Sequence, residues 1–62
     1  MWKKISYTDF IFETRKLEKT MDTAQETGPD PRRIVEFSTE GIISHYLETD
    51  KDGISTYFMW VE

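Results

Sequence analysis

The chain has 62 residues, a formal net charge of −4, one histidine and no cysteine. Its length allows one domain with a small core and marginal stability, and its composition excludes disulfides, thiolate metal sites and imidazole metal clusters. We therefore expect a single domain over residues 1–62 that holds no metal and no cofactor. No segment approaches the roughly 20 apolar residues needed to span a bilayer, so we expect no membrane partner. Residues 1–12 lack the apolar block of a secretion signal, and the absence of cysteine is compatible with the cytoplasm, so we expect a cytoplasmic protein.

Residues 2–12 predict a strand that extends at least to Tyr7. Their apolar side chains fall on both parities, with Ile5, Tyr7 and Ile11 on one and Phe10 and Phe12 on the other. The alternation is therefore only partial, and the end of this strand is not defined by the sequence.

The following block, up to Glu26, is polar and rich in helix-forming residues. It predicts a helix that begins at residue 9 or near residue 14 and ends near residue 27, with Gly28 as the C-terminal cap. Thr8 is the candidate N-cap for the earlier start. One helical stripe joins Phe10, Leu17, Met21 and Ala24. Three threonines weaken the helix prediction, and the alternative is one long strand followed by a mobile loop.

The segment Gly28-Pro29-Asp30-Pro31 predicts a stiff connector. Because proline is favoured at the first helical position, a second helix from Asp30 through Tyr46 is an alternative. A strand is the better interpretation, since the residues that follow are mostly β-branched or aromatic and Gly41 would lie in the middle of such a helix.

Residues 33–62 predict a three-stranded antiparallel meander with turns at 38–41 and 50–53, each ending in glycine. The expected fold class is α+β: an N-terminal strand, one helix and this meander. The alternative is a small all-β barrel, because the length and strand-rich layout are similar to those of SH3-like barrels. The chain lacks the aromatic-acidic start and the tryptophan pair of that family, so no property is transferred from it.

If both turns have an even number of residues, His45 opposes Phe58 and Tyr46 opposes Tyr57. One face then carries Val35, Phe37, Ile42, Ser44, Tyr46, Tyr57, Met59 and Val61. The other face carries Ile34, Glu36, Ile43, His45, Leu47, Thr56, Phe58 and Trp60. A one-residue bulge in either turn would exchange these partners.

Both faces are apolar, although an antiparallel sheet normally exposes one polar face to water. The face that contains Tyr46 and Tyr57 lacks charge and is the expected core. The other face mixes aromatic and polar side chains, as protein interfaces do. Its predicted interface residues are Glu36, Ile43, His45, Leu47, Phe58 and Trp60. The alternative is internal closure, in which the N-terminal segment with Trp2 and Ile5 folds over this face.

Catalytic and metal-binding motifs are weak in this chain, and we expect no enzyme activity. Asp50-Lys51-Asp52-Gly53 is similar to the start of a calcium loop, but Met59 occupies the position of the closing glutamate. Only Ser44 and Ser55 are candidate nucleophiles for His45. Glu36 is the expected cross-strand partner of that histidine.

The charges are distributed unevenly along the chain. Residues 1–33 hold seven basic and six acidic residues, whereas residues 34–62 hold one basic and six acidic residues. We therefore expect a small acidic protein-interaction module, an inhibitor or regulator that binds a protein with a basic surface, and a homodimer. One alternative is a nucleic-acid-binding module that uses an N-terminal basic and aromatic patch, formed by Trp2, Lys3, Lys4, Tyr7, Arg32 and Arg33. The other alternative is a structural homo-oligomer.

Overall fold

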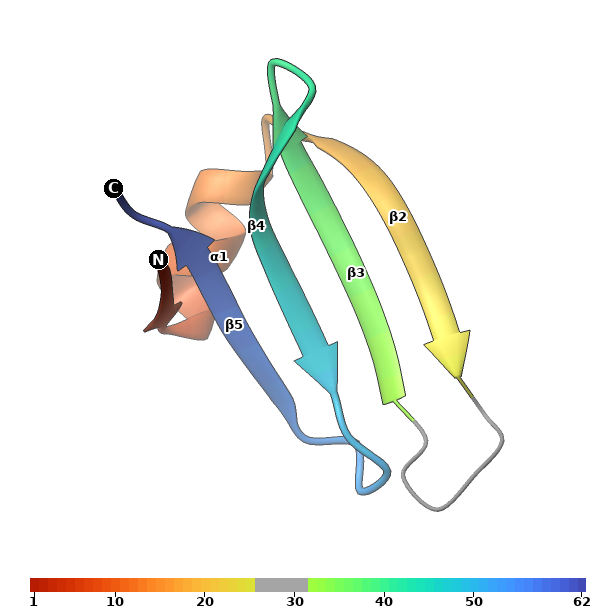
Figure 1. The fold of residues 1–62 in the computed structure, drawn as a ribbon. Helices are drawn as coiled ribbons and strands as arrows, with labels where there is room; N and C mark the ends of the chain where they lie inside the picture. The colour runs from red at the N-terminus through yellow and green to blue at the C-terminus, as the bar shows by residue number, and fades with distance from the viewer. Residues whose placement is uncertain (26–31) are drawn as a thin grey trace.

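The computed structural model describes residues 1–25 and 32–62, which form one sheet and one helix (Figure 1). The elements in chain order are β1 (Trp2–Ile5), α1 (Tyr7–Thr14), β2 (Glu18–Gln25), β3 (Arg32–Thr39), β4 (Ile42–Thr49) and β5 (Ser55–Trp60). The fold is therefore mostly strand, with an N-terminal strand, one helix and a C-terminal meander. Its layout differs from the prediction by one additional strand, β2. Strand β1 ends at Ile5 and Tyr7 begins the helix, so the prediction of a strand at least to Tyr7 was wrong.

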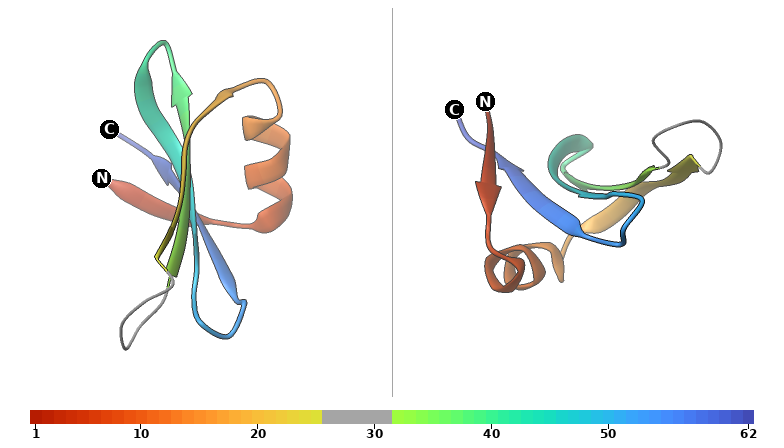
Figure 2. Two further views of the ribbon diagram at one scale, coloured as in Figure 1. Left: turned by 90° about the vertical axis from the view of Figure 1, so that its right-hand side faces the viewer. Right: turned by 90° about the horizontal axis from the view of Figure 1, so that it is seen from below.

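The strand order in the sheet is β1-β5-β4-β3-β2, and every neighbouring pair is antiparallel. Strands β2 to β5 form a continuous meander, and β1 pairs alongside β5 at one edge. The helix α1 packs on one side of the sheet, and no other described element covers the opposite side (Figure 2). We call these two sides the helix face and the open face.

The helix α1 begins at Tyr7 and ends after two turns. Ser6 is the N-cap, because its Oγ accepts a hydrogen bond from the backbone N–H of Asp9 at 3.1 Å. The prediction of Thr8 as the cap was therefore wrong by two residues. The predicted helix to residue 27 was also wrong, since the helix stops at Thr14.

Strand β2 occupies the C-terminal part of the segment that was predicted to be helical. It pairs with β3 along its whole length, and Asp22 lies opposite Val35. The Arg33 guanidinium donates to both carboxylate oxygens of Asp22, at 2.8 and 2.6 Å, and lowers the pKa of that carboxyl. Cross-strand hydrogen bonds thus outweigh the modest helix propensity of this threonine-rich segment. The predicted connector at 28–31 lies outside the described residues.

The two turns of the meander differ in length. Glu40 and Gly41 alone separate the paired residues of β3 and β4, and both have positive φ, 53° and 83°. At the second turn, the backbone N–H of Asp50 bonds to the carbonyl of Ile54 at 3.0 Å, which leaves three residues between them. Gly53, with φ of 81°, supplies the left-handed residue that such a three-residue turn requires.

These turns change which residues share a face. The pairing of β3 with β4 shifts by one residue between Phe37 and Ser38, where Ser44 is the extra residue on β4, and the second turn is odd instead of even. Each change shifts the pairing by one residue. The side chains of β3 and β5 therefore share faces as predicted, whereas most side chains of β4 lie on the face opposite to the predicted one. Tyr46 consequently opposes Phe58 on the open face, while His45 opposes Met59 on the helix face. The prediction that Tyr46 belongs to the core was therefore wrong.

The core lies between α1 and the sheet and is small. Phe10 is 1% exposed, and its ring centroid lies 5.6 Å from Phe37 and 5.1 Å from Tyr57. Val35, at 8% exposure, is the other buried apolar side chain among the residues whose burial the structure describes. A core of this size predicts a marginally stable monomer.

Candidate interaction surface

Four aromatic side chains lie together on the open face. They come from three neighbouring strands, Trp2 from β1, Phe58 and Trp60 from β5, and Tyr46 from β4. Trp2 pairs directly with Trp60, and Tyr46 pairs with Phe58, so each pair points to the same side of the sheet. We call these four residues the aromatic cluster.

The rings of the aromatic cluster contact one another in a chain. Trp60 packs edge-to-face on Trp2 with ring centroids 5.3 Å apart, and Trp2 packs edge-to-face on Tyr46 at 4.7 Å. Tyr46 stacks on Phe58, also at 4.7 Å, with an angle of 15° between the ring planes. Each such contact is worth about 0.5–1.5 kcal/mol beyond area burial. The cluster is therefore held in one arrangement before any partner arrives.

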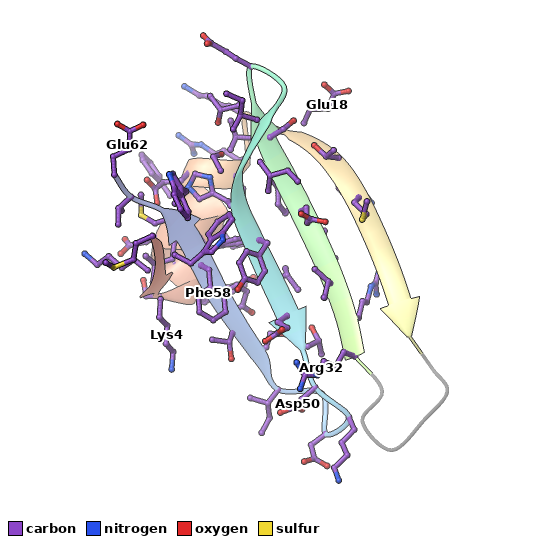
Figure 3. The ribbon with its side chains drawn as sticks, in the orientation of Figure 1. Lys4, Glu18, Arg32, Asp50, Phe58 and Glu62 are labelled. Atoms are coloured by element: carbon purple, nitrogen blue, oxygen red, sulfur yellow. The ribbon has the colours of Figure 1, made fainter. Side chains whose placement is uncertain are left out.

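The aromatic cluster remains accessible to solvent. Trp60 is 47% exposed and Trp2 is 38% exposed, whereas Tyr46 and Phe58 are half-buried. Figure 3 is viewed from the open side, with α1 behind the sheet, and shows Phe58 on the near side of β5. Clustered apolar side chains on a monomer surface mark interaction sites more often than isolated ones do.

Charged residues flank the rings along one row of cross-strand neighbours. Lys4 of β1 opposes Phe58, Phe58 opposes Tyr46, and Tyr46 opposes Glu36 of β3. The row therefore has an ammonium group at one end, two stacked rings in the middle and a carboxylate at the other end. Burial raises the pKa of the Tyr46 hydroxyl, and the nearby carboxylate of Glu48 adds to the rise.

The structure divides the six predicted interface residues between the two faces. By register, four of them lie on the open face: Glu36, Ile43, Phe58 and Trp60. The remaining two, His45 and Leu47, lie on the helix face, because the reversal of β4 carries them there. The expected pairing of Glu36 with His45 was wrong for the same reason, since Glu36 opposes Tyr46.

The sequence prediction missed two members of the aromatic cluster. The sequence places Tyr46 in the core, and it places Trp2 in a segment that folds over the face or in the basic and aromatic patch, not beside Trp60. Instead, β1 extends the sheet at the edge of β5. The Met1 ammonium donates to the Val61 carbonyl at 2.8 Å, and the Val61 N–H donates to the Met1 carbonyl at 2.9 Å. This pairing of the chain ends places Trp2 beside Trp60, and no local sequence signal indicates it.

His45 has a structural environment. The Oγ of Ser44 lies 2.8 Å from Nδ1, and Oε2 of Glu13 lies 3.8 Å from Nε2, beyond hydrogen-bond range. Nε2 is buried without a hydrogen-bond partner. The other candidate nucleophile, Ser55, bonds instead to Thr49 at 2.8 Å. His45 is thus a buried imidazole, and its Nδ1 is engaged by the hydroxyl of the neighbouring Ser44.

A hollow at one end of the open face is too small to favour a ligand site. Its volume is about 160 Å³, and it is lined by Arg32, Glu48, Asp50, Ile54 and Thr56. Typical small-molecule pockets occupy roughly 300–1,000 Å³. Arg32 and Glu48 approach within 3.4 Å across this hollow, so its charges are already partly compensated.

The predicted basic and aromatic patch is not assembled. Lys4 faces the open side by register, whereas Lys3 opposes Met59 of the helix face. Arg32 and Arg33 belong to β3, which β5 and β4 separate from β1. Tyr7 lies on the helix side, with its ring 5.4 Å from Tyr57. The N-terminal lysines and the two arginines therefore form separate sites.

Comparison with protein-family models, curated proteins and solved structures found no match. In the part of the chain that the structure describes, no group of three or more His, Cys, Asp or Glu residues could hold a metal ion. The same part contains no helix that is long and apolar enough to cross a membrane. The geometry of the open face is thus the main guide to function.

Proposed function

We propose that the chain is a small acidic, non-catalytic interaction module that binds a protein through the open face. The observation that supports this function most strongly is the aromatic cluster on a face that no described element covers. Tryptophan and tyrosine are the residues most enriched among binding hot spots. Rings that are preorganised by mutual contact lose little conformational entropy when a partner covers them.

The exposed area of the two tryptophans sets the scale of the binding energy. At 38% and 47% exposure, each ring system leaves about 100 Å² accessible from the roughly 250 Å² of a large aromatic side chain. Covering that area contributes a gross hydrophobic gain of about 2–3 kcal/mol per tryptophan at ~25 cal/mol per Å², from which the entropy cost of association is subtracted. Trp2 and Trp60 are therefore the expected anchors of the interface.

The charges around the open face favour a protein over a nucleic acid. Lys4 is a basic residue beside the cluster, but Glu36 and Glu48 lie on the same face. Arg32 is already within 3.4 Å of Glu48. A single-strand binder needs a continuous basic track beside its stacking rings, and this face has none in the described residues. The acidic groups would instead repel the phosphates of a nucleic acid.

A photo-cross-linking experiment tests this function. Phe58 is replaced by the photoreactive analogue p-benzoylphenylalanine, and a matched control carries it at Phe12, which is 64% exposed on α1. Irradiation in an extract of the native host should give a discrete protein adduct from position 58 and none from position 12. Equal labelling at both positions, or an adduct that nuclease removes, would contradict the proposal.

A further inference from the structure

We infer that the occupant of the open face is a second copy of this chain, packed sheet to sheet about a two-fold axis that runs parallel to β4 and β5. This inference rests on the proposed function, since it names the partner of the same surface. Three observations support it: the small core, the order of charges across the face, and the symmetry that this order allows.

The first observation is that the monomer buries little apolar surface. Phe10 and Val35 are the buried apolar side chains among the residues whose burial the structure describes, whereas both tryptophans remain more than one third exposed. For a chain of this size without disulfides or metals, association is one of the ways to complete a small core. Packing two open faces together would bury both aromatic clusters in one layer about 10 Å thick.

The second observation is the row of cross-strand neighbours Lys4, Phe58, Tyr46 and Glu36 on β1, β5, β4 and β3. From one end to the other, the row consists of a cation, two rings and an anion. The same row in reverse order is an anion, two rings and a cation. The row is therefore complementary to its own reverse, which is what a two-fold interface requires.

The third observation is where the axis must lie. A two-fold axis between β4 and β5, parallel to the strands, places Lys4 of one copy opposite Glu36 of the other. It also places Phe58 opposite Tyr46. Each contact occurs twice, because a two-fold interface repeats every pairing. The strands of two packed sheets cross at up to about 30°, which moves Lys4 and Glu36 away from exact opposition. The long side chain of Lys4 can span that displacement.

In this arrangement the rings supply affinity and the charges select the register. Exposed ion pairs contribute only about 0–1 kcal/mol each, whereas like charges placed opposite each other oppose association. Neither Lys4 nor Glu36 forms an ion pair within the described residues of its own chain. Both groups are thus available for a partner.

Charge reversal tests the register directly by sedimentation velocity over a range of protein concentrations. Lys4→Glu or Glu36→Lys alone should weaken self-association by about tenfold or more, because each homodimer then contains two like-charge contacts. An equimolar mixture of the two variants should form a heterodimer, since both contacts are restored. The double variant Lys4→Glu/Glu36→Lys should recover the homodimer. Lys3→Glu is the matched control, with the same charge change on the same strand but on the helix face, and it should leave association unchanged.

Far-ultraviolet circular dichroism establishes that each variant is folded, and recovery in the mixture excludes simple misfolding. A folded wild-type protein that stays monomeric at every concentration would overturn the inference. So would a dimer that neither charge reversal weakens. If the chain is monomeric while the probe at position 58 labels a different protein, the inference fails and the proposed function stands. If that probe labels nothing, the proposed function itself fails.

Discussion

Replacing Phe10 by alanine tests whether one side chain holds α1 against the sheet. Phe10 is 1% exposed, and its ring contacts those of Phe37, Tyr57 and His45, the last with centroids 6.2 Å apart. Truncating a buried phenylalanine costs about 3–5 kcal/mol in transfer energy and residual cavity. The whole fold of 62 residues has an expected stability of about 3–9 kcal/mol. The variant should therefore lose most of its stability.

The matched control is Phe12→Ala in the same helix. Phe12 is 64% exposed, and its ring lies 4.6 Å from the Arg15 guanidinium carbon. Loss of an exposed cation–π contact costs about 0.5–1 kcal/mol. Urea titrations followed by circular dichroism should thus move the midpoint far for Phe10→Ala and slightly for Phe12→Ala. Equal shifts for the two variants would refute the view that α1 is anchored by Phe10.

Three further predictions follow from individual groups. The hydrogen bonds from Arg33 lower the pKa of Asp22 in the folded protein. The stabilisation from this ion pair is therefore complete above the ordinary aspartate pKa near 3.9, and it is lost as the pH falls through the lower pKa of the folded state. Asp22→Asn should therefore flatten the acid limb of a stability-versus-pH curve, and an unchanged limb would contradict this assignment. Burial raises the pKa of Tyr46, so the contribution of its neutral hydroxyl to the stability of the fold is complete below pH 10 and is lost as the pH rises through the raised pKa. Tyr46→Phe should therefore remove one tyrosinate step above pH 10 from an absorbance titration at 295 nm. Ser44→Ala should cost about 1–3 kcal/mol in urea denaturation, because it leaves Nδ1 of the buried His45 without its hydroxyl partner, and a neutral effect would show that water replaces it.

The C-terminal half of the fold could be predicted because its signals are local. Gly41 and Gly53 both adopt positive φ at the turns where the sequence places them. The surplus of apolar surface was also visible, since Phe58 and Trp60 share one strand parity. They lie on the face that α1 leaves open.

The remaining features depend on contacts between distant residues. Strand β2 forms because Asp22 and its neighbours pair with β3, although the segment by itself favours a helix. One bulge and one odd turn determine which faces of the sheet Tyr46 and His45 occupy. A shift of one residue moves every side chain of a strand to the opposite face, and neither the bulge nor the turn length could be predicted from the sequence. Trp2 joins Trp60 through pairing of the two chain ends, for which no periodic pattern exists.

The tryptophan fluorescence of the wild-type protein tests the central claim most directly. The chain contains two tryptophans, and both belong to the aromatic cluster. As the protein concentration rises through the monomer–dimer transition, emission should shift to shorter wavelength and acrylamide quenching should decrease. An emission maximum and a quenching constant that stay the same across that transition would contradict the open face as the binding surface.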